Sequence, residues 1–161
     1  MSTADAKLPA APKLDGPAPG VLIVRAPYYT DVVDGLRDGA LRILGEAGAD
    51  AEVLDVAGAL ELSSAILFAV RGTRRRFDAY VALGCVVKGE TDHYEHVCRE
   101  AMAGLTRIAL DHALCLGNGL LTVATAAQAL ERSRSDGHNK GAEAAAAALI
   151  QLRAARHLGA V

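Results

Sequence analysis

The chain of 161 residues has no tryptophan, and four tyrosines with two phenylalanines make up its whole aromatic content. With so few rings, we expect no extended surface on which nucleic-acid bases stack. Neither sign of charge predominates, because 17 basic and 19 acidic residues leave a net charge of -2. These two features argue against a nucleic-acid partner.

Long apolar runs are absent as well. No uninterrupted apolar segment of about 18 residues occurs, so the sequence predicts no membrane-spanning helix and no membrane partner. Residues 1–20 lack the apolar stretch of a secretory signal. The three cysteines form no CxxC pair, and an odd number without a signal favours free thiols in a reducing compartment. We therefore expect a cytoplasmic protein.

The chain is instead rich in alanine, with 33 alanines and 52% apolar residues in total. A chain of this length forms one domain that buries roughly two thirds of its unfolded surface. Alanine-rich helices pack closely, so the run Ala142–Ala148 is a candidate contact surface with another helix or another subunit. Four of the five prolines lie within residues 1–20, which predicts a flexible N-terminal arm before a domain over residues 21–161.

Apolar patterning in the domain alternates between two periods. Strand-like runs occupy 21–24, 51–56, 77–87 and 120–123, and helical spacing occupies 33–47, 58–70, 97–114, 126–134 and 142–157. Alternating strands and helices predict an α/β fold, a flavodoxin-like three-layer sandwich with a four-stranded parallel sheet. The third strand is apolar on both faces, as a central parallel strand is.

The turn after the third strand is the best candidate for a ligand site, because open parallel sheets bind ligands at their carboxyl ends. Gly89 lets the backbone turn tightly and approach a ligand, while Asp92 and Glu95 fit a capping box at the start of a long helix. The positive end of that helix favours an anion. His93, in the first turn, would lie beside a bound phosphate. A purely structural helix cap explains the same residues.

Other chemistry has weaker support. His93 and His96 have metal-ligand spacing, but no further ligand cluster accompanies them. The sequence has no GxxxxGK[ST] loop, and no GxGxxG follows the first strand, which disfavours nucleotide sites of those kinds. The basic stretch 132–140 is explained by a solvated loop as well as by anion binding. Glu61 is explained either by a ligand or by the helix dipole.

Five segments in order resemble the lumazine synthase family, over about Val21 to Leu158. The strongest is 84–94, which matches the family pattern G-x-V-[IV]-[RK]-G-x-T-x-H-[FY]. The others are Gly58–Glu61, similar to PGA-[FYL]-E; Asn118–Val123; Gln128-Ala129 with Arg132; and Asn139–Ala145, similar to N-K-G-x-E-A-A. At four positions the chain departs from the family: Ala57, Ser63, Ala124 and Thr125. These departures touch pocket walls and strand ends.

The resemblance implies an enzyme of riboflavin biosynthesis that needs no cofactor or metal. It would condense 5-amino-6-ribitylamino-uracil with 3,4-dihydroxy-2-butanone 4-phosphate to give 6,7-dimethyl-8-ribityllumazine. His93 would be the catalytic acid and base. The implied substrate-binding residues are Tyr28, Ala59, Leu60, Glu61, Val86, Val87, Lys88, Gly89, Glu90, Thr91, Asn118, Arg132 and Lys140. Two alternatives stay open: a divergent paralogue that binds flavin or lumazine or forms a shell with little catalysis, and a monomeric phosphate or FMN module.

The resemblance also implies a homopentamer. Whether the pentamer stays single or assembles further into an icosahedral shell is left open by the sequence. Tyr28 would stack on the pyrimidine in one subunit, while Asn118, Arg132 and Lys140 would come from the next. The N-terminal arm would add a strand to the adjacent subunit's sheet. Riboflavin synthase is a further candidate partner.

Overall fold

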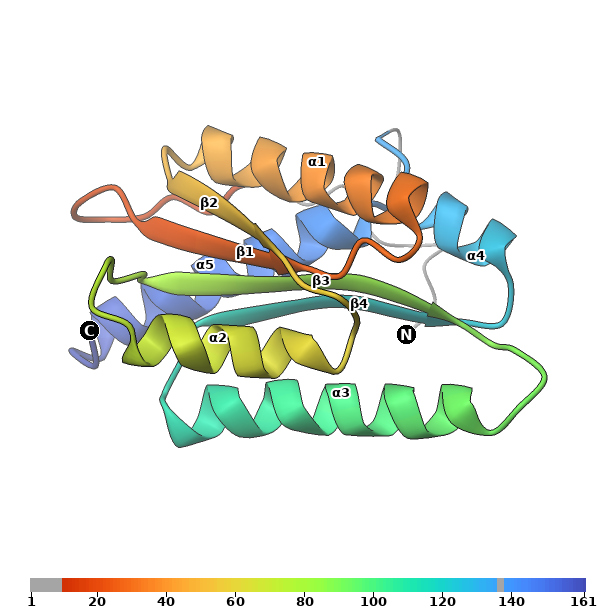
Figure 1. Cartoon of the computed structure of the whole chain (residues 1–161). Coiled ribbons are helices and arrows are strands. Elements are labelled where there is room, and N and C mark those ends of the chain that lie inside the picture. Colours follow the sequence, from red (N-terminus) through yellow and green to blue (C-terminus); the bar gives the residue numbers. More distant parts are fainter. Residues whose placement is uncertain (1–9, 136–137) are drawn as a thin grey trace.

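A computed structural model describes residues 10–135 and 138–161 (Figure 1). The predicted arm therefore lies outside the described residues over positions 1–9. Strands and helices alternate along the described chain. The elements are β1 (Gly20–Arg25), α1 (Thr30–Glu46), β2 (Asp50–Asp55), α2 (Glu61–Arg71), β3 (Ala79–Val87), α3 (His93–Asp111), β4 (Leu116–Val123), α4 (Ala126–Glu131) and α5 (Lys140–His157).

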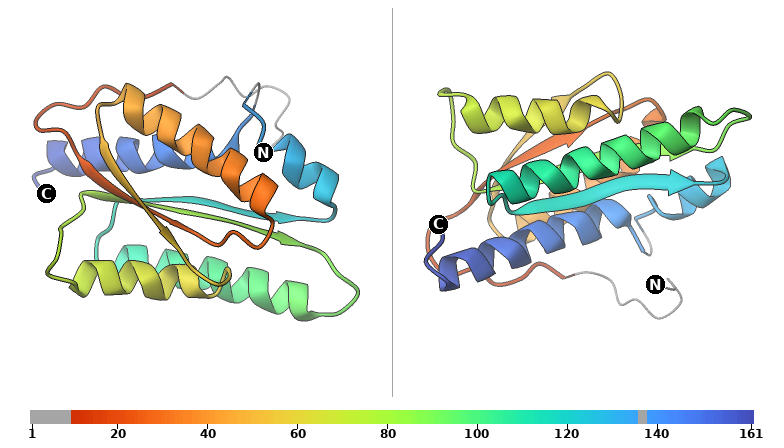
Figure 2. Two further views of the ribbon diagram at one scale, coloured as in Figure 1. Left: turned by 45° about the horizontal axis from the view of Figure 1, so that its top comes forward. Right: turned by 90° about the horizontal axis from the view of Figure 1, so that it is seen from below.

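The four strands form a parallel sheet in the order β2-β1-β3-β4. Strand β3 is central and buried from Ala79 to Cys85. Helices α1, α4 and α5 cover one face, and α2 and α3 cover the other, as Figures 1 and 2 show. Alternate strand residues enter the two cores, since Val21 and Ile23 face α1 while Leu22 and Val24 face α2. The predicted α/β flavodoxin-like sandwich is confirmed.

Strand β4 begins at Leu116, four residues before the predicted start. The sequence interpretation placed Gly117 and Gly119 before the strand, but both lie inside it. The reason is the close approach of α5: a Cβ on Gly117 would lie 1.9 Å from the carbonyl oxygen of Ala144. Helix α4 is correspondingly shorter than predicted and ends at Glu131.

The alanine-rich start of α5 packs inside its own chain. Within Ala142–Ala148, every alanine except Ala147 is buried against the core that α1 and β4 share. Gly141 extends this contact, because a Cβ there would lie 1.9 Å from the carbonyl oxygen of Leu36 on α1. The small side chains therefore let α5 pack closely on α1 and on the sheet. A subunit surface is not needed to explain the run.

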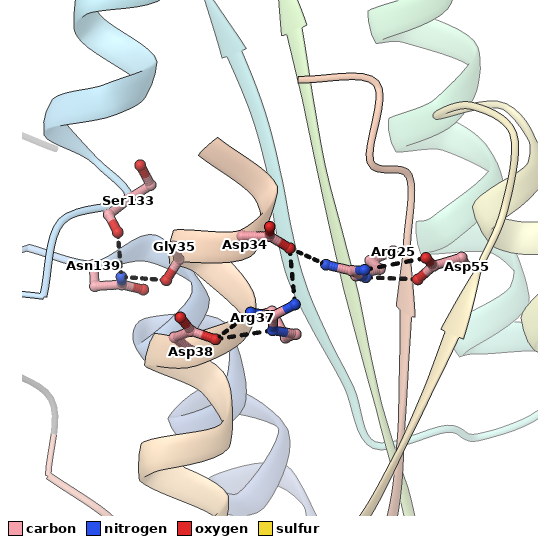
Figure 3. Close-up of polar contacts among 8 residues, drawn as sticks. All are labelled: Arg25, Asp34, Gly35, Arg37, Asp38, Asp55, Ser133 and Asn139. Atoms are coloured by element: carbon pink, nitrogen blue, oxygen red, sulfur yellow. Dashed lines mark hydrogen bonds and ion pairs between the residues drawn. The ribbon is translucent and has the colours of Figure 1, made fainter. Parts of the chain in front are cut away.

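Asn139, at the start of α5, has a buried amide side chain that joins α1, the α4–α5 connection and α5. It is 3% exposed. Its Nδ2 donates to the carbonyl oxygens of Gly35 at 2.9 Å and Ser133 at 2.8 Å, and its Oδ1 accepts the backbone N–H of Ala142 at 3.0 Å (Figure 3). The side chain thus caps α5 and ties the α4–α5 connection to α1.

We expect Asn139→Ala to lower the free energy of unfolding by about 2–4 kcal/mol, since it leaves several buried backbone groups without partners. Urea denaturation of the purified protein measures this. Thr125→Ala is the matched control, because Thr125 also caps a helix but is exposed. A loss of stability no greater than that of the control would contradict the bridging role of Asn139.

The described part of the arm lies along α5. The guanidinium of Arg156 donates to the carbonyl oxygens of Asp15 at 2.7 Å and Pro17 at 3.1 Å. Ala11 and Leu14 are partly buried against the core. None of the helices in the described part of the chain combines the length and apolarity needed to cross a membrane.

Candidate functional site

A hollow of about 340 Å³ lies where the sequence predicted a site, at the carboxyl ends of β1 and β3 and beside the first turn of α3. We call it the ring hollow. Its walls come from three connections: β1–α1, β2–α2 and β3–α3. The lining residues are Tyr28, Tyr29, Gly58, Ala59, Leu60, Glu61, Cys85, Val86, Val87, Gly89, Thr91, His93, Tyr94 and Val97.

One wall of the ring hollow is aromatic and exposed. The Tyr28 side chain is 78% exposed and meets Tyr29 edge to face, with ring centroids 5.1 Å apart. Leu60, across the hollow, is also exposed. An exposed ring and an exposed leucine flanking a concave surface suit a planar, partly apolar ligand.

The opposite end of the ring hollow is the start of α3. Asp92 is the N-cap, but its backbone is helical (φ -67°, ψ -6°) and its side chain makes no capping hydrogen bond. The predicted capping box of Asp92 and Glu95 is therefore wrong. The backbone at Asp92 is helical, and its carbonyl oxygen accepts the N–H of Glu95 at 3.0 Å. The N–H of Glu95 therefore bonds to the backbone of Asp92 and not to its side chain. The first turn thus keeps its positive end uncovered by the Asp92 carboxylate.

Gly89 differs from the expectation of a tight turn. Its φ is not positive, and a Cβ built on it would meet nothing within 4 Å. The chain itself therefore does not require glycine here. The open space lies on the wall of the ring hollow, where a missing side chain leaves room for a ligand to reach the backbone.

The inner wall of the ring hollow carries neutral groups. Burial raises the pKa of the Cys85 thiol to about 11. Burial also raises the pKa of Tyr94 above its ordinary value. Both side chains are therefore protonated at neutral pH, and this wall adds no negative charge near an anionic ligand.

The buried Cys85 thiol makes stability depend on alkaline pH. Its pKa in the folded chain lies above the ordinary 9.0. The neutral thiol therefore stabilises the fold fully below about pH 9, and this contribution is lost as the pH rises toward 11. We expect the free energy of unfolding to fall less between about pH 8 and 10.5 in Cys85→Ala than in the unmodified protein. Urea denaturation at both pH values measures this, and equal falls would contradict it.

A second hollow of about 390 Å³ lies on β4 and the first turns of α5. We call it the cation hollow, because Arg132 and Lys140 line it. The full lining is Asn118, Gly119, Leu120, Leu121, Thr122, Val123, Arg132, Lys140, Glu143, Ala144 and Ala147. No residue lines both hollows.

The polar groups of the cation hollow have distinct partners. Arg132 donates to the carbonyl oxygen of Gln128 at 2.9 Å and lies 3.6 Å from the Glu131 carboxylate. The Lys140 ammonium contacts the Glu143 carboxylate at 2.6 Å. Asn118 uses its Oδ1 to accept the backbone N–H of Leu120 at 3.0 Å.

The structure thus divides the predicted substrate-binding residues into two groups. Eight of them and His93 line the ring hollow, whereas three line the cation hollow. Lys88 and Glu90 line neither of these hollows and are exposed on the β3–α3 connection. Within a single described chain, His93 and Arg132 therefore lie on the walls of different hollows.

Comparison with known proteins decides the family. A family model described as 6,7-dimethyl-8-ribityllumazine synthase matches residues 19–156. The chain belongs to this family. Curated relatives with the same name occur in Azorhizobium caulinodans, 48% identical over 139 residues (84% of this chain and 86% of the relative), and in Nitrobacter winogradskyi, 47% identical over 141 residues (86% of each). A third, in Afipia carboxidovorans, is 43% identical over 141 residues, with the same coverage of 86% of each chain.

Membership of the lumazine synthase family makes the chain an enzyme, a transferase of riboflavin biosynthesis. The resemblance inferred from the five sequence segments is confirmed, and the noncatalytic paralogue is not favoured. Among residues 10–135 and 138–161, no group of three or more histidine, cysteine or acidic side chains is placed to hold a metal ion.

In this lumazine synthase family member, an ion-pair network that the sequence did not reveal lies where β1 and β2 end. Arg25, at the end of β1, donates from Nε to Asp55 of β2 at 2.6 Å and from Nη1 to Asp34 of α1 (Figure 3). The hydrogen bond to Asp55 is the main reason that the pKa of Arg25 is raised. The network fixes the ends of the two strands that lead into the Tyr28 and Ala59 walls.

Sequence reasoning also missed five residues that line the ring hollow: Tyr29, Gly58, Cys85, Tyr94 and Val97. Cys85 and Tyr94 lie within the quoted family segment, and Gly58 opens another, so position in a motif was a usable signal for them. Val97 follows one helical turn after His93 and shares its face, which is a signal that depends on knowing where α3 begins.

Proposed function

We propose that this chain condenses 5-amino-6-ribitylamino-uracil with 3,4-dihydroxy-2-butanone 4-phosphate, and that each complete site forms between two subunits of a homopentamer. The observation that carries the proposal is the separation of the two hollows. One has an aromatic wall and His93, and the other has Arg132 and Lys140. Joining the ring hollow of one subunit to the cation hollow of the next would bring both sets of groups to one pair of substrates.

The ring hollow suits the pyrimidine substrate. Tyr28 would stack on the ring, while Ala59 and Leu60 would line it and Glu61 would accept hydrogen bonds from ribityl hydroxyls. The backbone of Val86 and Val87, at the end of β3, would pair with the pyrimidine edge. A ring stacked on one tyrosine needs no wider aromatic surface, which agrees with the low aromatic content of the chain.

The phosphate substrate suits the start of α3. The connection Gly89–Thr91 brings backbone N–H groups and the positive end of the helix to its phosphate. Lys88 and Glu90 flank this anion subsite on the same connection. Arg132 of the neighbouring subunit would add charge-assisted hydrogen bonds, with Asn118 and Lys140 beside it.

His93 would lie between these two subsites and move the protons. The amine of the pyrimidine attacks the ketone carbon, and loss of water gives an imine. Removal of a carbon-bound proton then lets the C–O bond to phosphate break, and closure of the second ring with loss of water completes the lumazine. A positioned acid and base accelerates such a reaction roughly 10²–10⁴-fold. Holding two substrates together supplies much of the remainder. This chemistry requires neither a metal nor a cofactor.

The proposal is tested by mixing the purified protein with both substrates and following the fluorescence of the lumazine product. We expect product well above the uncatalysed rate. Binding of flavin or lumazine without product formation would contradict the synthase activity and would indicate a binding paralogue instead. Product formation that needs an added metal would contradict the metal-free chemistry.

The proposed assembly has its own test. We propose that the protein works in the cytoplasm as a homopentamer and that riboflavin synthase uses its product. Sedimentation measures the assembly directly. A species of 16.7 kDa would be a monomer and would contradict a shared site.

A further inference from the structure

We propose that Glu143 is a positioning residue, which holds the Lys140 side chain in place within the cation hollow. The inference rests on the proposed function of that hollow. Lys140 Nζ lies 2.6 Å from Glu143 Oε2, one helical turn away on α5, and both side chains line the same hollow. A flexible lysine restrained in this way keeps its ammonium in one position, where a ligand can meet it without ordering the side chain first.

The carboxylate sits on a rigid base. Asn139 caps the first turn of α5, and the contact of Gly141 with the Leu36 carbonyl leaves no room for that turn to shift toward α1. Ala144, the next residue after Glu143, packs on Gly117 of β4. The backbone that carries Glu143 is therefore fixed from both sides, so its side chain can set the position of Lys140.

The second carboxylate oxygen of Glu143 points to a role beyond stability. Oε1 is buried and has no hydrogen-bond partner among the described residues. A buried, unpaired carboxylate oxygen costs free energy. A carboxylate kept at this cost suits a functional site more than it suits a surface ion pair, and its other oxygen, Oε2, is the one that holds Lys140.

Among the described residues, the neighbouring cation has no carboxylate partner as close as this. Arg132 lies 3.6 Å from Glu131, whose side chain is 74% exposed, whereas the Lys140 and Glu143 side chains are 26% and 33% exposed. An exposed pair contributes little. The carboxylate at Glu143 therefore holds its lysine far more closely than the carboxylate at Glu131 holds its arginine. Glu131 is for this reason the matched control.

A double-mutant cycle tests the inference. Glu143→Gln keeps the size of the side chain and removes its charge, and Lys140→Met removes the ammonium. We expect Glu143→Gln to lower kcat/KM about tenfold. The loss should affect the same substrate as the loss in Lys140→Met, and it should arise from the same parameter, kcat or KM. In the Lys140→Met background, Glu143→Gln should have almost no further effect, because its only route to the site is Lys140. Glu131→Gln should leave the kinetics unchanged, and Glu143→Asp should restore part of the activity.

Three results would overturn the inference. An equal loss from Glu143→Gln in both backgrounds would indicate a structural role, and thermal unfolding of each variant would show it. Unchanged kinetics in Glu143→Gln would remove the role altogether. An inactive unmodified protein would overturn the proposed function and this inference together, whereas an active one with an unaffected Glu143→Gln variant would overturn this inference alone.

Discussion

Replacing Arg132 with alanine is expected to raise the KM for the butanone phosphate by about 10²-fold and to change the KM for the pyrimidine much less. A guanidinium forms charge-assisted, often bidentate hydrogen bonds to phosphate, and water replaces them poorly. Folding should survive the change. Among residues 10–135 and 138–161, the Arg132 guanidinium contacts the backbone carbonyl of Gln128 and the exposed Glu131 carboxylate.

Steady-state kinetics with each substrate varied in turn measures the two KM values. Arg134→Ala is the control, because Arg134 is an exposed arginine two residues further along that does not line the cation hollow. An equal rise of both KM values in Arg132→Ala would argue against a phosphate clamp. A rise of the phosphate KM in the control as well would indicate a general effect of charge.

Replacing His93 with alanine should lower kcat by about 10²–10⁴-fold, with small changes in either KM. His93 is exposed in the first turn of α3 and lines the ring hollow beside Thr91, so its removal takes away a proton carrier without opening the core. The rate of lumazine fluorescence at saturating substrates measures kcat.

His96→Ala is the matched control for this variant. His96 is exposed on the same helix, and the ring hollow does not include it. A full kcat in His93→Ala would mean that another group moves the protons. An equal loss in both variants would assign the effect to the stability of α3 instead of to the imidazole.

Elements with a strong local pattern were predictable from the sequence. The sequence places β3 within 77–87 because the run is apolar on both faces, and the structure has it at Ala79–Val87. The start of β4 was missed because glycine has little local preference for strands, whereas the close approach of Gly117 to Ala144, more than 20 residues away, accounts for it. The capping box failed for a similar reason, since sequence letters do not fix the backbone angle of Asp92.

The residues of the candidate site also fall into those that the sequence predicts and those that depend on the packed fold. His93, Tyr28 and the Ala59 wall were predictable, since each follows a strand end or lies in a quoted motif. The Arg25–Asp55 network and the Lys140–Glu143 contact were not, because side-chain pairing depends on the packing of the finished fold. The scarcity of aromatics now has a specific meaning: few rings are present, and the exposed ring of Tyr28 stands where one heterocycle would stack.

The central claim, that two subunits share each site, is tested by mixing two impaired variants and assaying them at a butanone phosphate concentration far below the KM of Arg132→Ala. His93→Ala lacks the proton carrier of the ring hollow, and Arg132→Ala lacks the clamp of the cation hollow. The two proteins are unfolded together in equal amounts, refolded, and assayed beside each variant refolded alone. If neighbouring subunits share sites, random assembly gives about a quarter of the interfaces both intact halves, so about a quarter of the unmodified activity should return. A mixture no more active than the separate variants would contradict the shared site.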